Sequence, residues 1–217
     1  MTDAAISGLT ELAEAPAAGD LIVITDVSDT TQSANGTSKK NTVANFIASA
    51  VNQKTELKPQ HRIPPLSGIN AAGLSLVEST DAGTYKPAKH ILSFDDSTDE
   101  GAMWEFRPPQ AFTTATLKIT YYMSGANTSK SVGWVAYVAA ISDTDTSVTA
   151  FAFDSANTGT TTCPDAAGTE DEASITLTNA DSLAVGDRAV ILIRRNAAVA
   201  NDATGDCNYT YGEIQYS

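Results

Sequence analysis

The first fifty residues open with a pattern that predicts a β-hairpin. In the stretch DLIVITDVSD, residues 20–29, apolar side chains occupy both alternating faces of the expected strand. Such a strand has to be covered on each side. The dipeptide Asn35-Gly36 follows, and it is the strongest short-range hairpin signal because both residue types accept positive φ at low cost. We therefore expect a return strand from Thr37 to Thr42.

A short amphipathic helix is predicted directly after this hairpin. Asn41 or Thr42 can act as its N-cap, because both side chains accept hydrogen bonds from the free amides of a first helical turn. Apolar residues then recur at the i, i+3, i+4, i+7 spacing of one helical face. They are Val43, Phe46, Ile47 and Ala50.

A hairpin and a helix within residues 1–50 are too small to be stable alone, because the surface of a domain grows relative to its volume as the domain shrinks. We therefore expect this module to be an attachment element that is stabilised by copies of itself or by a larger body. The side chains expected to make this docking contact are Leu21, Val23, Ile24, Val43, Phe46 and Ile47.

Residues 51–89 show little periodicity and contain four prolines and three glycines. Proline favours extended backbone, and both residue types interrupt regular elements. The sequence therefore predicts an extended connector over this range.

From His90 onward the texture changes to short alternating segments separated by turns rich in Asp, Gly and Asn. Eight strands with a period of two indicate an all-β sandwich, and we predict an eight-stranded jelly-roll-like domain over residues 90–217. The eight segments are HILSFD, AMWEFRP, ATLKITYYM, VGWVAYVAAI, SVTAFAFD, ASITLT, RAVILIRR and NYTYGEIQY. The predicted fold class is thus mainly β.

One of these strands, residues 131–141, is apolar on both faces. A strand of a single sandwich usually leaves one face to water, so this strand is expected to be buried twice. Either another subunit or loops of the same domain would cover the second face. In the first case Trp134, Val135 and Tyr137 are candidate subunit-interface residues.

The charge argues against two classes of partner. Thirteen basic and 26 acidic residues give a net charge of -13, which repels nucleic-acid phosphates and anionic lipid surfaces. Residues 90–217 hold seventeen of the acids and six of the bases, whereas residues 51–89 hold three acids and five bases. No apolar run approaches the ~20 residues of a transmembrane helix, and the first residues lack a signal-peptide pattern. We expect a soluble chain made in the cytoplasm.

Little in the sequence points to catalysis, and we expect no enzyme, no cofactor and no metal. The nucleophile-elbow, zinc-protease and phosphate- or dinucleotide-loop motifs are absent. Acidic loops such as FDDSTDEG and GTEDEAS are typical solvated turns, with a glycosidase carboxylate pair or calcium ligands as the alternatives. Cys163 and Cys207 are either two reduced side chains or one bridge between loops. Arg194 and Arg195 either neutralise Asp187 or Asp202, or bind an acidic ligand.

Three segments near the N-terminus resemble the N-terminal part of many tailed-bacteriophage fibre and appendage proteins. These segments are ISGLTEL (residues 6–12), PAAGDLIVITD (residues 16–26) and GTSKKNTV (residues 36–43). In that family the segment resembles an attachment module, usually in threefold assemblies. The last ~128 residues also look similar to a β-sandwich at the distal ends of phage structural proteins. The chain departs from a typical tail fibre because it lacks a long repetitive shaft.

The resemblance implies a structural protein of a phage virion, most simply a homotrimeric spike or head fibre that decorates the capsid. Residues 1–50 would dock on the major capsid protein or a tail protein, and the sandwich would project outward, where it could adhere to the host. The alternative is a tail fibre whose sandwich binds a bacterial surface glycan. Exposed aromatic rings that would stack on sugars are Tyr122, Tyr209 and Tyr211, unless they are half-buried strand residues.

Overall fold

The structure is a computed structural model, and it divides into two units, Met1–Asn52 and Gln53–Ser217. The residues that the structure describes are 21–26, 37–42, 54–65, 68–80, 85–109, 111–142 and 149–217. Within these ranges no helix is long and apolar enough to cross a membrane.

The first unit contains the expected antiparallel hairpin of β1 (Leu21–Asp26) and β2 (Thr37–Thr42). The return strand therefore has the predicted bounds. The turn predicted at Asn35-Gly36 lies outside the described part of the chain. In the described pairing, Thr37 lies opposite Asp26 and Thr42 lies opposite Leu21. The helix predicted over residues 43–50 lies outside the described part of the chain.

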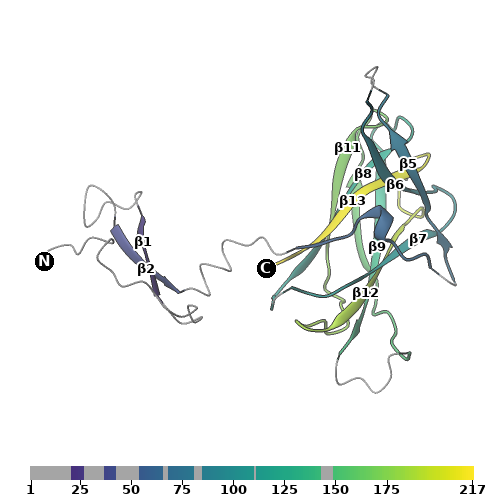
Figure 1. Cartoon of the computed structure of the whole chain (residues 1–217). Helices are drawn as coiled ribbons and strands as arrows, with labels where there is room; N and C mark the ends of the chain where they lie inside the picture. The colour runs from purple at the N-terminus through teal and green to yellow at the C-terminus, as the bar shows by residue number, and fades with distance from the viewer. Residues whose placement is uncertain are drawn as a thin grey trace, which may run out of the picture. The chain divides into compact units, whose positions relative to one another are not determined.

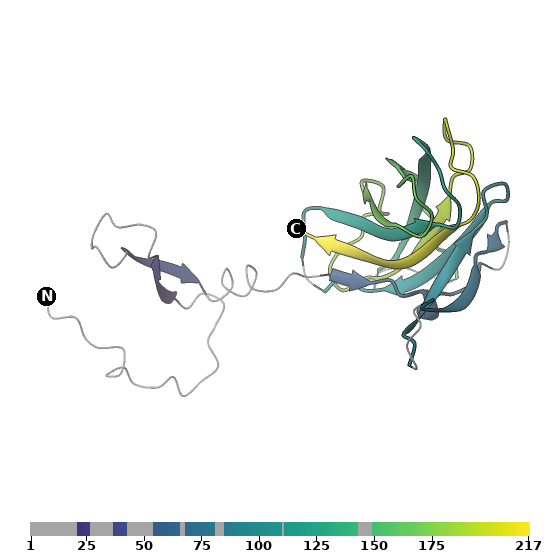
Figure 2. The same cartoon turned by 90° about the horizontal axis from the view of Figure 1, so that it is seen from above.

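The second unit is a sandwich of two β-sheets (Figures 1 and 2). One sheet has the strand order β10-β9-β12-β7-β4, and the other has the order β11-β8-β13-β6-β5, with β3 paired to β13. The strands are β3 (Lys54–Glu56), β4 (Asn70–Ala71), β5 (Gly73–Glu78), β6 (Ala88–Phe94), β7 (Glu100–Phe106), β8 (Ala115–Met123), β9 (Ser131–Ile141), β10 (Asn157–Thr162), β11 (Glu170–Thr176), β12 (Arg188–Arg195) and β13 (Cys207–Tyr216).

The eight strands from β6 to β13 have the connectivity of a jelly roll. Their order is β6-β13-β8-β11 in one sheet and β7-β12-β9-β10 in the other, and all of these pairs are antiparallel. The chain thus crosses repeatedly between the two sheets, as in double Greek-key sandwiches. The predicted β-sandwich class is confirmed.

One of the eight predicted strands is wrong. The described part of SVTAFAFD, residues 149–154, contains no strand, and the fifth strand is β10, the threonine-rich stretch NTGTTT. One aromatic side chain of the predicted segment packs onto the sheet from outside. The ring of Phe153 packs on Tyr137 of β9 with centroids 6.3 Å apart. Alternation alone does not distinguish a covering loop from a strand.

The predicted connector over residues 51–89 is also wrong over its described part, because this range contributes to the sandwich. β3 pairs with β13, and β5 pairs with β6. Between them lies a short 3-10 helix, η2 (Pro59–His61). Leu57 is fully buried in the core, and Trp104 Nε1 donates a hydrogen bond of 2.9 Å to the carbonyl of Lys58. Burial and hydrogen bonding hold a proline-rich stretch that has little intrinsic preference for a strand.

The centre of the core is a cluster of aromatic side chains between the sheets. Trp134 contacts Phe94 edge to face with centroids 5.3 Å apart, and it contacts Tyr121 with centroids 5.8 Å apart. The ring centroids of Tyr209 and Trp104 lie 5.5 Å apart. Aromatic pairs with this geometry add to the stabilisation that burial provides.

Strand β9 is buried on both faces, as expected, and its own chain does the covering. Trp134 is fully buried in the inner core, and Val135 is 2% exposed on the outer face. Tyr137 is half-buried beneath Phe153, and a side chain at Gly133 would collide with Val199. The domain's own loops are therefore the cover, and the interpretation of Trp134 and Val135 as subunit-interface residues is wrong.

Candidate functional site

The outer face of the β11-β8-β13 sheet carries polar and aromatic side chains that point away from the core. A β-bulge in β13, between Tyr209 and Tyr211, decides which tyrosines belong to this face. Tyr209 lies opposite Tyr121, which points into the core, whereas Tyr211 lies opposite Thr120, which points outward. In a regular strand without the bulge, Tyr209 and Tyr211 would lie two positions apart and share one face.

Tyr209 is therefore not a ligand-facing residue, and its assignment as a glycan contact is wrong. Its side chain is fully buried, and its hydroxyl donates a hydrogen bond to the carbonyl of Leu57. Burial raises the pKa of Tyr209 well above the usual value of a tyrosine. This residue attaches the start of the second unit to its last strand.

Tyr211 lies in a network of charges between β3 and β13. Lys54 Nζ lies 5.6 Å from the centre of the Tyr211 ring and forms an ion pair of 2.6 Å with Glu213. The Tyr211 hydroxyl donates to Glu56 Oε1 at 3.1 Å. The hydrogen bond to Glu213, followed by that to Tyr211, raises the pKa of Lys54 well above its usual value. Within this network the pKa of Glu56 and the pKa of Glu213 are both lowered.

Tyr122 has similar neighbours on the same face. Lys89 Nζ lies 5.3 Å from the centre of its ring and forms an ion pair of 2.9 Å with Glu170. The hydrogen bond from Lys89 lowers the pKa of Glu170. Since Tyr122 pairs with Asn208, two positions from the Thr120–Tyr211 pair, the two rings are diagonal neighbours on adjacent strands.

This face, which we call the tyrosine face, is defined by Tyr122 and Tyr211 with their lysine and carboxylate neighbours. Both rings are half-buried, and each has a lysine over its ring. Flat rings beside ionised carboxylates and amides can stack on and hydrogen-bond to a hydroxyl-rich ligand.

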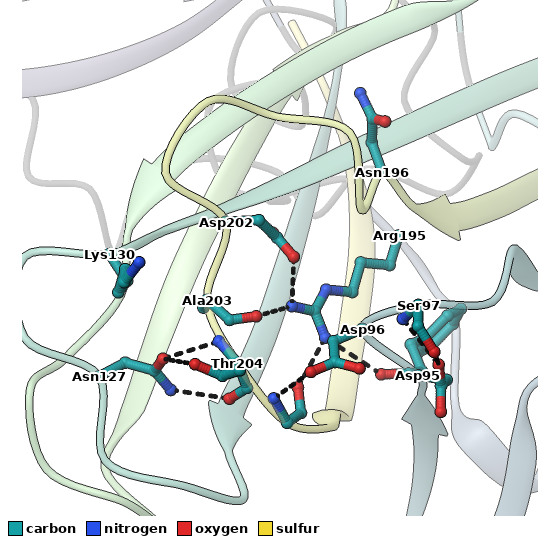
Figure 3. A network of polar contacts seen from close by, with 12 residues as sticks. Asp95, Asp96, Ser97, Asn127, Lys130, Arg195, Asn196, Asp202, Ala203 and Thr204 are labelled. Atoms are coloured by element: carbon teal, nitrogen blue, oxygen red, sulfur yellow. Dashed lines mark hydrogen bonds and ion pairs between the residues drawn. The ribbon is translucent and has the colours of Figure 1, made fainter.

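A second polar cluster links several loops at one end of the sandwich (Figure 3). Its centre is the Arg195 guanidinium, whose side chain is fully buried. Arg195 forms an ion pair of 2.9 Å with Asp202 and donates to the carbonyls of Gly205 at 2.7 Å and of Phe94 at 3.4 Å. It also donates to the carbonyl of Ala203. The guanidinium thus occupies a cage of oxygen atoms.

The neighbouring side chains extend this cluster to two more loops. Asp96 accepts a hydrogen bond of 2.6 Å from the amide of Gly205, and Asn127 accepts one of 2.8 Å from the amide of Thr204 (Figure 3). Burial raises the pKa of Asp202 even though the charge of Arg195 acts to lower it. The cluster therefore fixes loop positions and offers no free charge of its own.

The two adjacent arginines have separate partners. Arg195 neutralises Asp202, as one alternative predicted, whereas Arg194 pairs with Asp99 at 2.6 Å. Asp187, the other predicted partner, accepts a hydrogen bond from the amide of Ala184 instead. Because both arginines already form ion pairs within the protein, they are poorly placed to bind an acidic ligand.

The acidic loop FDDSTDEG is largely paired within the protein. Asp95 accepts hydrogen bonds from the amides of Ser97 at 2.7 Å and Thr98 at 2.8 Å. It also accepts one from the Ser97 hydroxyl, which is the largest cause of its lowered pKa, and the two amide bonds lower the pKa further. Across the described ranges, no group of three or more His, Cys, Asp or Glu side chains is arranged to hold a metal ion.

The two cysteines belong to the larger unit, and the candidate docking residues belong to the first unit. Cys163 and Cys207 are both buried and both free. Leu21, Val23 and Ile24 lie in β1, but their side chains fall outside the described part of the structure, as do Val43, Phe46 and Ile47 altogether. The docking residues therefore stay a prediction.

Known proteins are similar to this chain only at a low level. No family model and no curated protein matches the chain. Among solved structures, the N-terminal modules of endo-1,4-beta-D-xylanase 10B from Clostridium thermocellum, complexed with xylohexaose, are similar over 76% of this chain and 26% of that one. The identity is 14% and the TM-score 0.37. A structure from a study of carbohydrate-binding modules of the beta-sandwich superfamily is similar over 90% of this chain and 70% of that one, with 11% identity and a TM-score of 0.34. At these scores the neighbours assign no function to the chain.

Proposed function

We propose that the protein is a structural component of a bacteriophage virion: a homotrimeric, capsid-decorating spike that acts by binding rather than by catalysis. Residues 1–52 dock on the particle, through the major capsid protein or a tail protein, and the sandwich projects outward. The observation that carries this proposal is the division of the chain into a very small hairpin unit and a separate sandwich.

The pairing of the hairpin explains why the small unit needs a partner. The apolar strand LIVITD pairs only with the polar strand TSKKNT among the described residues, so that Val23 lies opposite Lys40 and Ile24 opposite Lys39. A two-stranded hairpin is marginally stable in water. The apolar residues of β1 therefore gain their burial from neighbouring copies or from the particle surface. The resemblance of the flanking segments to phage attachment modules agrees with this role.

The larger unit is suited to a position away from the surface of the virus particle. It has its own aromatic core, and most of the chain's negative charge lies in residues 90–217. A net negative charge keeps neighbouring copies soluble and disfavours nonspecific adsorption to nucleic acid.

Charged substitutions in β1 test the docking role in the full-length chain. We expect the double variant Val23→Asp, Ile24→Asp to reduce co-sedimentation with virions of the encoding phage by at least about tenfold, because two charges would have to be buried at the contact. The sandwich should keep its melting temperature. The matched control is Val185→Asp, which makes the same chemical change at a side chain that is 52% exposed on the sandwich.

Two outcomes would contradict this proposal. One is that the wild-type chain is missing from purified virions by mass spectrometry. The other is that the β1 variant sediments with the particles as well as the Val185 control does.

Glycan adhesion through the tyrosine face is a second candidate function. It is favoured by the two half-buried rings, which lie diagonally on one sheet face beside ionised carboxylates. We expect Tyr211→Ala and Tyr122→Ala each to weaken binding on a bacterial-glycan array by about tenfold, the effect of losing about 1.4 kcal/mol of ring contact. Tyr85→Ala is the matched control, because Tyr85 is 95% exposed and lies outside this face. Unchanged array binding in both face variants would exclude the site.

A further inference from the structure

The hairpin of β5 and β6 presents a part of the core-side sheet face that nothing described covers. In antiparallel pairs, residues directly opposite each other point to the same side of the sheet. Leu74 lies opposite Leu92, which is fully buried in the core. The same side continues with Leu76 opposite His90, but Leu74 is 42% exposed and Leu76 is 60% exposed. The core face therefore extends past the core, along a hairpin that projects from the sandwich (Figures 1 and 2).

Strand β5 is also an open edge. It is the last strand of its sheet in the described part of the chain, and all six of its residues are exposed. The amide of Ser79 donates to the carbonyl of Pro87, so by alternation the backbone groups of Leu74 and Leu76 point away from β6. Proteins usually protect such edges with charges, prolines or bulges. An apolar, unprotected edge strand indicates a binding surface.

The distribution of charge favours a second copy of the same chain as the partner. Copies with a net charge of -13 repel one another and can approach most closely where that charge is weakest. Residues 51–89, which include β5 and the start of β6, hold five bases and three acids, whereas residues 90–217 hold six bases and seventeen acids. Within the hairpin itself, residues 73–90, Glu78 and Asp81 are balanced by Lys86 and Lys89, so copies that meet there repel less than at the strongly acidic remainder of the sandwich.

We infer that the exposed core-side face of the β5–β6 hairpin, formed by Leu74, Leu76, Ala88 and His90, is the contact between copies of this chain. This inference rests on the proposed homotrimer and adds where its subunits meet. Docking through the N-terminal units would hold the sandwiches close together, which raises the effective concentration of the hairpins.

The first test measures the mass of the full-length chain by analytical ultracentrifugation. Leu76→Asp is expected to raise the concentration of half-dissociation by at least about 100-fold, because the contact would bury an unpaired charge. Ser75→Asp is the matched control, since Ser75 is an exposed neighbour in the same strand that points to the opposite side. A Leu76 variant with the same mass as wild type overturns the inference, and so does a monomeric wild-type chain.

A second test asks directly whether the hairpins meet. Leu76→Cys is expected to form covalent dimers under mild oxidation, while Ser75→Cys is not; Cys163 and Cys207 are buried in both variants. Equal cross-linking of both variants, or of neither, counts against the contact.

The docking assay separates this inference from the function on which it rests. If Leu76→Asp still forms trimers on virions, only the hairpin contact fails; if wild type does not bind virions, the virion role fails, and the mass and cross-linking results decide the contact alone.

Discussion

Arg195→Met is expected to lower the free energy of unfolding by about 3–5 kcal/mol, the usual cost of removing one partner of a buried ion pair. The substitution leaves the Asp202 carboxylate, whose side chain is 15% exposed, without its counter-charge. It also removes the donor from the carbonyls of Ala203 and Gly205. Urea denaturation of the full-length chain, followed by circular dichroism, measures the change.

The neighbouring arginine supplies the control for this prediction. Arg194 pairs with Asp99, whose side chain is 60% exposed, so Arg194→Met is expected to cost about 0–1 kcal/mol. The double variant Arg195→Met, Asp202→Leu should recover part of the lost stability, because it no longer buries a lone charge. Equal effects of the two single arginine substitutions would show that the cage around Arg195 contributes no more than a surface pair.

Trp134→Ala is expected to destabilise the sandwich by a similar amount, about 3–5 kcal/mol, because it leaves a large cavity among Phe94 and Tyr121. Thermal unfolding monitored by circular dichroism measures this effect. The oligomeric mass should not change at temperatures where the variant is folded, because Trp134 is fully buried within one chain.

A milder substitution at the same position tests the physical reason. Trp134→Phe keeps an aromatic ring in the cluster and removes the indole Nε1, which is buried without a hydrogen-bond partner among the described residues. We expect it to cost clearly less than the alanine variant. If Trp134→Ala dissociated the oligomer while leaving the melting temperature unchanged, Trp134 would belong to a subunit interface after all.

The sequence predicts the sandwich well where a strand carries a strong hydrophobic signal. Strands β8 and β12 have their predicted bounds, because their alternating or apolar residues match the pleat of a sheet with a packed inner face. Strand β10 was missed because its threonine and glycine residues carry little hydrophobic signal. Gly159 is nevertheless well suited to its place, since a Cβ there would lie 2.8 Å from a carbon of Ile175.

The candidate site was harder to predict, because one inserted residue decides it. Strict alternation places Tyr209 and Tyr211 on the same face, and the bulge at Thr210 places them on opposite faces. The strands within residues 51–89 were missed for another reason: they are short, and prolines lie between them. A usable signal was present in Leu74-Ser75-Leu76, which alternates as a strand does and predicts two apolar side chains on one side.

The pairing of β3 with β13 has a mechanical consequence. Lys54 lies opposite Gln215, so the larger unit begins beside the place where the chain ends. A force that pulls on the chain before Lys54 would act first on the three residue pairs between β3 and β13 and on the hydrogen bond between Leu57 and Gly212. Only then would it act on the strands of the jelly roll. We expect these few bonds to break first and to form again when the force is removed, so that β3 would unpair reversibly while the eight strands of the jelly roll stay folded.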